Sequence, residues 1–139
     1  MKKIFVIFLI FISVFLCGFK NRRPLVLLSS RSIVQGNEAY LTKYFEKNQR
    51  IYYMIYFPRG MKKGIYRVQI FKKDDKSEFW GYKQMHHYDY KIDEKGKKYI
   101  TDYFVMLENG HFVVQVFNLQ NVNKCVALGD FWVKWFLMK

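Results

Sequence analysis

Apolar and polar residues alternate with a period of two along much of this chain, the pattern of half-buried β-strands. The two clearest runs are residues 50–57 and 65–72. Turn residues follow each run, at 58–60 and 73–76, so we expect two separate strands. The side chains predicted to point inward are those of Ile51, Tyr53, Ile55, Phe57, Tyr66, Val68 and Ile70.

Further strands are predicted on both sides of this pair. Towards the C-terminus they are residues 99–107, 112–119 and 124–135, preceded by a less regular stretch at 79–90. Asn109-Gly110 is a strong hairpin signal, and Gly129 predicts a bulge inside the last strand. Towards the N-terminus, the candidate first strands are residues 25–28 and 39–45, with a helix as the alternative for 39–45.

Short strands separated by turn signals, without a sustained helical period, predict an all-β fold, an antiparallel β-sandwich of seven or eight strands. A small β-barrel is the alternative. Residues 108–116 resemble the corner between strands E and F of immunoglobulin-like domains, where an acidic residue, a glycine and a tyrosine lead into an inner strand. Phe112 stands at the tyrosine position. The resemblance implies an immunoglobulin-like sandwich over residues 25–139.

The N-terminus carries a different pattern: Lys2 and Lys3, then an apolar run at 4–16 interrupted only by Ser13. A short basic region before an apolar run of this length is typical of a secretory signal peptide, and the run is short for a spanning helix of about 20 residues. Residues 14–18, Val-Phe-Leu-Cys-Gly, resemble the lipobox of bacterial lipoproteins. The resemblance implies cleavage after residue 16 and lipidation of Cys17.

We therefore expect a signal peptide at 1–16, a tether at 17–24 and an exported domain that is anchored to a membrane of the bacterial cell envelope. An uncleaved anchor and soluble export are the alternatives. The chain has two cysteines, so a lipidated Cys17 leaves Cys125 without a disulfide partner. Cys125 is expected to be a buried small apolar residue in its strand.

Charge is the strongest functional indication in the remaining domain. The chain has 24 Lys and Arg against 11 Asp and Glu, and removal of residues 1–16 still leaves a net charge of +11. Such a surplus favours anionic partners, here a membrane surface or an envelope polymer rather than nucleic acid. The loops that carry these charges need not share one surface. The candidate anion contacts are Arg59, Lys62, Lys63, Lys95, Lys97 and Lys98.

Candidates for chemistry are few. His86 and His87 are adjacent, so on a strand they point to opposite faces, while His87 and Asp89 make only a two-ligand fragment. His111 lies at a turn, and the sequence has no nucleotide-binding or hydrolase motif. We expect no cofactor, no metal and no catalysis. A binding surface is predicted at Trp80, Tyr82, Trp132 and Trp135. A broader exposed aromatic face is a second hypothesis, with covering of the second face of a sheet as its alternative; its residues are Tyr52, Tyr56, Phe71, Tyr82, Tyr88 and Tyr90.

The function that these observations favour is that of a membrane-anchored, non-catalytic β-sandwich that binds or scaffolds another envelope component. A basic module that adsorbs to anionic polymers or to the membrane surface is the second hypothesis. A small metal-dependent enzyme is the third, with candidate residues His86, His87, Asp89 and His111.

Overall fold

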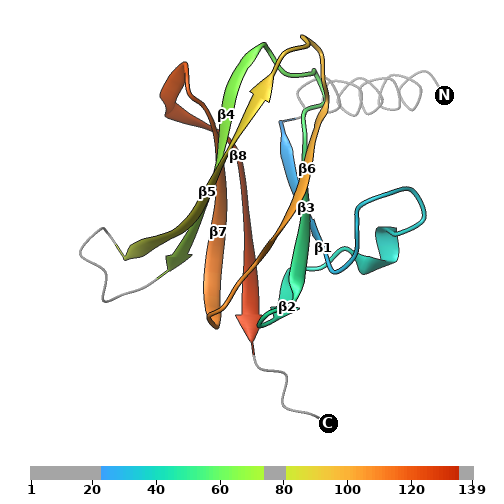
Figure 1. Cartoon of the computed structure of the whole chain (residues 1–139), viewed down its shortest axis with the longest axis vertical. Helices are drawn as coiled ribbons and strands as arrows, with labels where there is room; N and C mark the ends of the chain where they lie inside the picture. Colours follow the sequence, from blue (N-terminus) through green and yellow to red (C-terminus); the bar gives the residue numbers. More distant parts are fainter. Residues whose placement is uncertain (1–22, 74–80, 135–139) are drawn as a thin grey trace, which may run out of the picture.

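The computed structural model describes residues 23–73 and 81–134, which form two β-sheets (Figure 1). The three-stranded sheet, called sheet A, has the order β1-β3-β6, with β1 at Leu25–Ser29, β3 at Arg50–Tyr56 and β6 at Tyr99–Val105. The five-stranded sheet, called sheet B, has the order β2-β8-β7-β4-β5. Its strands are β2 (Tyr44–Glu46), β4 (Gly64–Lys73), β5 (Tyr82–Ile92), β7 (Gly110–Asn118) and β8 (Asn121–Lys134).

This strand order is that of an immunoglobulin-like sandwich. When the short β2 is left aside, sheet A joins the first, second and fifth strands, as A, B and E do in immunoglobulin domains. Sheet B joins β8, β7 and β4 as G, F and C are joined, and β5 extends it. All these neighbours are antiparallel, whereas β2 runs parallel to β8. The predicted antiparallel immunoglobulin-like sandwich is confirmed.

The turn around Asn109 connects the two sheets and does not close a hairpin. It leads from β6, in sheet A, to β7, in sheet B, so the predicted Asn-Gly hairpin is wrong and the corner implied by the family resemblance is correct. Gly110 has a φ of 152°, and a Cβ atom there would lie 2.8 Å from Cε of Lys72. Phe112 is fully buried and stacks on Phe131 with ring centroids 5.2 Å apart.

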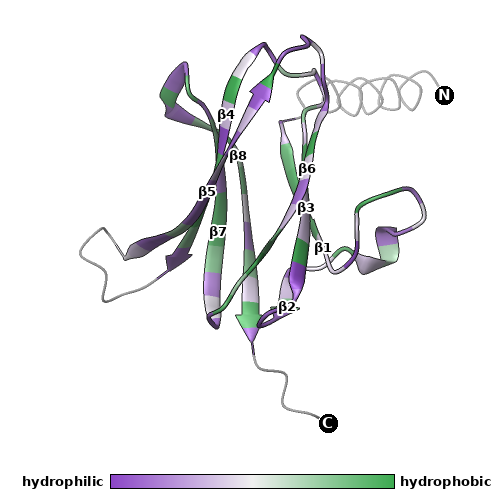
Figure 2. Cartoon of the chain, viewed as in Figure 1, coloured by the Kyte–Doolittle hydropathy of each residue, from purple (hydrophilic) through white to green (hydrophobic). Residues whose placement is uncertain are grey.

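The core lies between the sheets and is built from alternate residues of the strands. Figure 2 shows the alternation as changes of colour along β3, β7 and β8. Apolar burial of this kind is the main favourable term in folding, at about 25 cal/mol per Å². All seven side chains predicted to point inward are buried, namely Ile51, Tyr53, Ile55, Phe57, Tyr66, Val68 and Ile70.

Two predicted elements near the ends of the chain differ from the structure. Residues 39–45 do not form one strand, because the 3-10 helix η1 spans Glu38–Tyr40 and β2 begins only at Tyr44. In the segment between them, Thr42 N–H donates a hydrogen bond of 3.0 Å to the carbonyl of Leu28, at the end of β1. Residues 82–92 form the strand β5, whose pairing with β4 shifts register between Ile70 and Phe71, while residue 79 and its neighbours lie outside the described ranges.

The predicted bulge at Gly129 is also wrong. Gly129 pairs in register with Val114, and the irregular pairing of β7 with β8 lies around Phe117 instead. A Cβ atom at Gly129 would stand 2.9 Å from Cβ of Val26, so glycine is needed where β1 of sheet A passes close to β8.

A chain of hydroxyl groups joins the sheets at the side where β5 and β6 are the outer strands. Tyr90 of β5 donates a hydrogen bond of 3.0 Å to Oδ2 of Asp102 on β6. Since that bond uses the only proton of the Tyr90 hydroxyl, the neighbouring hydroxyl of Tyr53 donates to Tyr90. Burial is the main reason why the pKa values of both tyrosines are raised well above 10.0. The two hydroxyl groups therefore stay protonated at neutral pH.

Candidate binding surfaces

The six predicted anion contacts lie on two loops at one end of the sandwich. The loop between β3 and β4 carries Arg59, Lys62 and Lys63, and the loop between β5 and β6 carries Lys95, Lys97 and Lys98. Figure 1 shows both loops at the top, at the same end as the start of β1. The structure therefore gathers charges that the sequence left unassigned to any common surface.

Backbone hydrogen bonds join the two loops directly. Met61 N–H donates to the carbonyl of Lys97 over 2.8 Å, and Gly96 N–H returns a bond of 2.9 Å to the carbonyl of Met61. Phe57 N–H donates to the carbonyl of Lys98 over 2.7 Å. These bonds use no lysine side chain. We call the joined loops the basic platform, defined by Arg59, Lys62, Lys63, Lys95, Lys97 and Lys98.

The close approach of the loops depends on a glycine at position 60. A Cβ atom on Gly60 would lie 2.7 Å from Cα of Gly96 and 2.9 Å from its carbonyl oxygen. Gly60 also has a φ of +77°, in the region that favours glycine. A larger residue at position 60 would have to push the loops apart, so the glycine fixes the spacing of the platform.

A hollow of about 560 Å³ adjoins the platform. Three of the side chains that line it are cationic, those of Arg23, Lys62 and Lys124. Cys125 lines it too and is exposed, so the prediction that Cys125 is buried is wrong. Cys125 lies opposite Phe117, at the irregular part of the pairing between β7 and β8, and its Sγ donates a hydrogen bond of 3.0 Å to the carbonyl of Ala127.

The predicted aromatic binding surface is not a single patch among the described residues. Trp80 and Trp135 lie outside them. Tyr82 is at the start of β5 and is 39% exposed, whereas Trp132 is on β8, and β7 and β4 lie between these strands. Both faces of the Trp132 ring have neighbours, His111 at 4.1 Å and Tyr44 at 5.6 Å between ring centroids.

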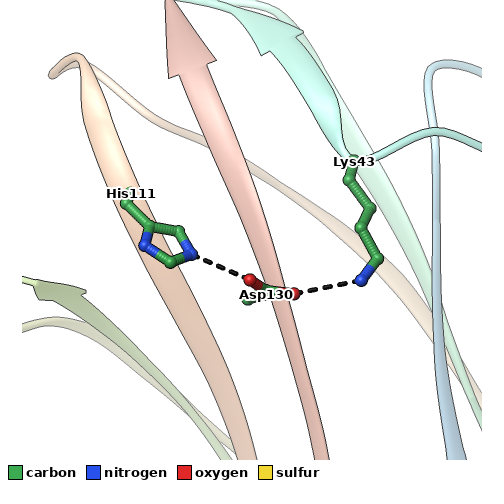
Figure 3. A network of polar contacts seen from close by, with 3 residues as sticks. All are labelled: Lys43, His111 and Asp130. Carbon is green, nitrogen blue, oxygen red and sulfur yellow. Dashed lines mark hydrogen bonds and ion pairs between the residues drawn. The ribbon is translucent and has the colours of Figure 1, made fainter.

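His111 belongs to a small network of polar contacts on the outer face of sheet B (Figure 3). Its Nε2 lies 2.8 Å from Oδ2 of Asp130, and Nζ of Lys43 lies 3.1 Å from Oδ1 of the same carboxylate. The hydrogen bond from His111 is the main reason why the pKa of Asp130 is lowered, and Lys43 adds to it. The network connects β7 and β8 with the residue that precedes β2.

The other candidate ligands are placed as the alternation predicted. His87 and Asp89 share the outer face of β5, and His86 points the other way and stacks on Tyr88. Arg67 of β4 holds both carboxylate oxygens of Asp89, at 2.8 and 2.9 Å, and this bond lowers the pKa of Asp89. Nowhere in residues 23–73 and 81–134 do three His, Cys, Asp or Glu side chains gather as a metal site requires.

On the outer side of sheet A, two tyrosines that the sequence did not single out, Tyr99 and Tyr103, lie beside Tyr56 and Tyr52. Tyr56 of β3 stacks on Tyr99 of β6 with ring centroids 5.3 Å apart, and Tyr52 lies against Tyr103 at 5.7 Å. The broader aromatic face considered from the sequence is divided, because Tyr88 and Tyr90 turn towards the core. The strict alternation in residues 50–57 and 99–105 was the available signal, since it leaves a tyrosine at every second outward position, four residues apart.

Comparison with known proteins adds little about function. No protein-family model matches the chain, and no curated protein matches its sequence. Among solved structures, the chain is similar to one described as a candidate superoxide reductase from Thermotoga maritima, with a TM-score of 0.45 and 9% sequence identity. The match covers 84% of this chain and 90% of that one. At this distance no ligand or reaction transfers from that protein to this chain.

The apolar run at 4–16 and Cys17 lie outside the described residues. Within the part of the chain that the structure describes, no helix has the length and apolarity needed to cross a bilayer.

Proposed function

We propose that this chain is an exported, membrane-anchored, non-catalytic binding domain of the bacterial envelope. Its basic platform docks on the anionic surface of the membrane, and its strand faces are left to bind or scaffold another envelope component. The anchor is the N-terminal segment, by lipidation at Cys17 or by retention of the apolar run at 4–16.

The observation that carries this proposal is the joining of two basic loops at the end of the sandwich where β1 begins. A basic residue close to an anionic leaflet contributes about 1 kcal/mol of attraction. The platform holds six such residues in a fixed arrangement, and Arg23 and Lys124 line the hollow beside it. Charge on the platform and the start of the domain thus support the same docking direction.

The length of the tether supports the same arrangement. Six residues, 17–22, separate the end of the apolar run from Arg23. Six residues can span at most about 20 Å, since an extended chain covers about 3.3–3.6 Å per residue. The Debye length in physiological salt is about 8 Å, so the platform feels the field of charged lipid when the tether is folded back, and a short tether favours that close approach.

The groups capable of chemistry are engaged in ways that favour a structural role. Asp130 accepts hydrogen bonds from His111 and Lys43, and Asp89 accepts two from Arg67. Partners of this kind stabilise both carboxylates in their charged form. A carboxylate that is to act as a general acid needs a raised pKa, which is the opposite shift.

The docking is tested with the full chain and one fluorescent label. Cys17→Ser leaves Cys125 as the sole thiol, and Cys125 is exposed beside the platform, so a polarity-sensitive dye on it reports the surroundings of that end. The protein is inserted into vesicles of phosphatidylcholine, either alone or mixed with phosphatidylglycerol. We expect a blue-shifted signal only in the anionic vesicles, reversed by added salt.

A matched pair of variants separates the effect of the platform on docking from the effect of the protein's net charge. Lys95→Gln, Lys97→Gln and Lys98→Gln together should abolish the shift. The control, Lys73→Gln, Lys83→Gln and Lys134→Gln, removes the same charge at the opposite end of the sandwich and should keep it. Equal signals in both kinds of vesicle would overturn the docking. A signal that a soluble polyanion produces without vesicles would favour the anionic-polymer hypothesis instead.

A further inference from the structure

The outer face of sheet A has a row of apolar and aromatic residues next to the basic platform. Leu25 of β1 pairs with Tyr56 of β3, and Tyr56 pairs with Tyr99 of β6, so the three residues form one line across the sheet. Leu25 is 50% exposed and Tyr99 is 48% exposed. We call these three residues the interfacial row.

The row is continuous with the platform in the chain and in space. Lys98 immediately precedes Tyr99, and the carbonyl of Lys98 accepts the hydrogen bond from Phe57, which follows Tyr56. Arg23 and Pro24, which line the hollow beside the platform, lead directly into Leu25. β1 therefore begins at the end of the sandwich that carries the platform (Figure 1).

Charge is distributed unequally over the two outer faces. The next line on sheet A, Leu27, Met54 and Thr101, is also uncharged. The outer face of sheet B instead carries ion pairs, Arg67 with Asp89 and Lys43 with Asp130. A surface that enters the region between lipid headgroups and acyl chains must avoid charge at its leading positions, and of the two faces only that of sheet A meets this condition next to the platform.

We propose that the interfacial row of Leu25, Tyr56 and Tyr99 enters the interface of an anionic bilayer, so that the sandwich lies tilted with sheet A towards the lipid. Tyrosine rings are favoured at this depth because one end is apolar and the other is polar, and leucine gains by burial. The basic platform meets the phosphate groups at the same time. This inference rests on the proposed docking and adds its direction: sheet B, with β5 at its outer edge, faces away from the membrane.

Depth-dependent quenching tests the tilt in the full chain. In a background of Cys17→Ser and Cys125→Ser, a fluorophore is attached to Tyr99→Cys in one protein and to Ile65→Cys in the other. Ile65 is the matched control because it is 43% exposed and lies at the same end of the sandwich, on the outer face of sheet B. Vesicles with phosphatidylglycerol carry nitroxide groups high on their acyl chains.

We expect strong quenching at position 99 and none at position 65. Equal quenching at both positions, or none at 99 while the separate Cys125-labelled protein still reports docking, would overturn the tilt and leave the proposed docking in place. No quenching at 99 together with no docking signal from the Cys125-labelled protein would overturn both. A change at position 99 that depends on protein concentration without vesicles would show that a second copy covers the row, which also overturns the inference.

A second pair of variants measures the contribution of the row to binding. Leu25→Ser with Tyr99→Ser should weaken the docking and lower the salt concentration at which the docking signal is reversed, because the apolar burial that adds to the charge attraction is removed. Ile65→Ser with Leu128→Ser, two exposed positions on sheet B, should leave it unchanged. An equal loss in both pairs would count against the row.

Discussion

Gly60 and Gly96 lie in contact across two loops that are 36 positions apart in the sequence, and no Cβ atom fits at position 60. This contact brings three basic residues of one loop beside three of the other. The spacing of the platform is thus set by backbone packing, whereas its charge is set by side chains, and the two properties can be changed separately.

Gly60→Ala should therefore disrupt the platform without altering its charge. The left-handed backbone alone costs an alanine about 1–2 kcal/mol, and the collision with Gly96 adds to this. Denaturant unfolding measures the total loss, and faster amide exchange of Gly96 N–H would report the broken bond to Met61. Gly36→Ala is the control, because Gly36 also has a positive φ but has open space around it. Equal effects of the two variants would refute the role of the contact.

Cys17 should be the N-terminus of the mature protein and should carry acyl chains. Mass spectrometry of the protein from membranes tests this, with Cys17→Ala expected to remain unprocessed. Leu16 stands where the lipobox usually has glycine, alanine or serine. The variant Leu16→Ala should therefore be cleaved before Cys17 at least as completely as the native chain. Detection of an intact Met1 on the native chain would contradict lipidation and would indicate an uncleaved anchor instead.

Tyr53→Phe should lower stability at neutral pH by about 1 kcal/mol, because the Tyr90 hydroxyl loses one of its two hydrogen-bond partners and keeps only the carboxylate of Asp102. The raised pKa of Tyr53 means that its neutral hydroxyl stabilises the fold fully below about pH 10, and this contribution is lost as the pH rises beyond that. The difference between the variant and the native chain should shrink towards pH 11 or so. Urea midpoints across this range measure it, with the exposed Tyr99→Phe as control.

Asp130→Asn should destabilise the protein at neutral pH by less than about 1 kcal/mol, since the carboxylate is partly exposed. The pKa of Asp130 is lowered in the folded state from its ordinary 3.8, so its contribution is present above that value and is lost as the pH falls through the folded pKa. Thermal unfolding should show a gap between variant and native chain at pH 7 that shrinks as the pH falls below 3.8 and closes below the lowered pKa of Asp130. A gap that persists in acid would mean that packing of His111 or Trp132 is involved.

Much of the fold follows from local patterns. The alternation in residues 50–57 and 65–72 identifies β3 and β4 and the buried face of each, because a strand with one buried face needs an apolar side chain at every second position. The corner at Asn109 shows the limit of such signals. The same turn residues suit a hairpin or a crossing between sheets, and only the pairing of β6 with β3 selects the crossing.

The candidate site was less predictable. In the sequence, Gly60 and Gly96 each indicate an ordinary turn. Their contact cannot be predicted from it, because it depends on how sheet A and sheet B position the two loops. Gly129 predicted a local bulge, but the reason for a glycine there is the close approach of Val26, which is distant in the sequence. Cys125 is exposed because the pairing near Phe117 is irregular, which the apolar neighbours of the cysteine do not reveal.

The parallel pair of β2 and β8 also has a mechanical consequence. β1 starts at the top of Figure 1, where the proposed N-terminal anchor would pull, while β8 ends at the bottom. A force between these points acts along the strands, so it loads the hydrogen bonds of β1 with β3, and of β2 with β8, in shear and all together. The sandwich therefore resists stretching between these two points, because β1 and β2 cannot be peeled away one bond at a time.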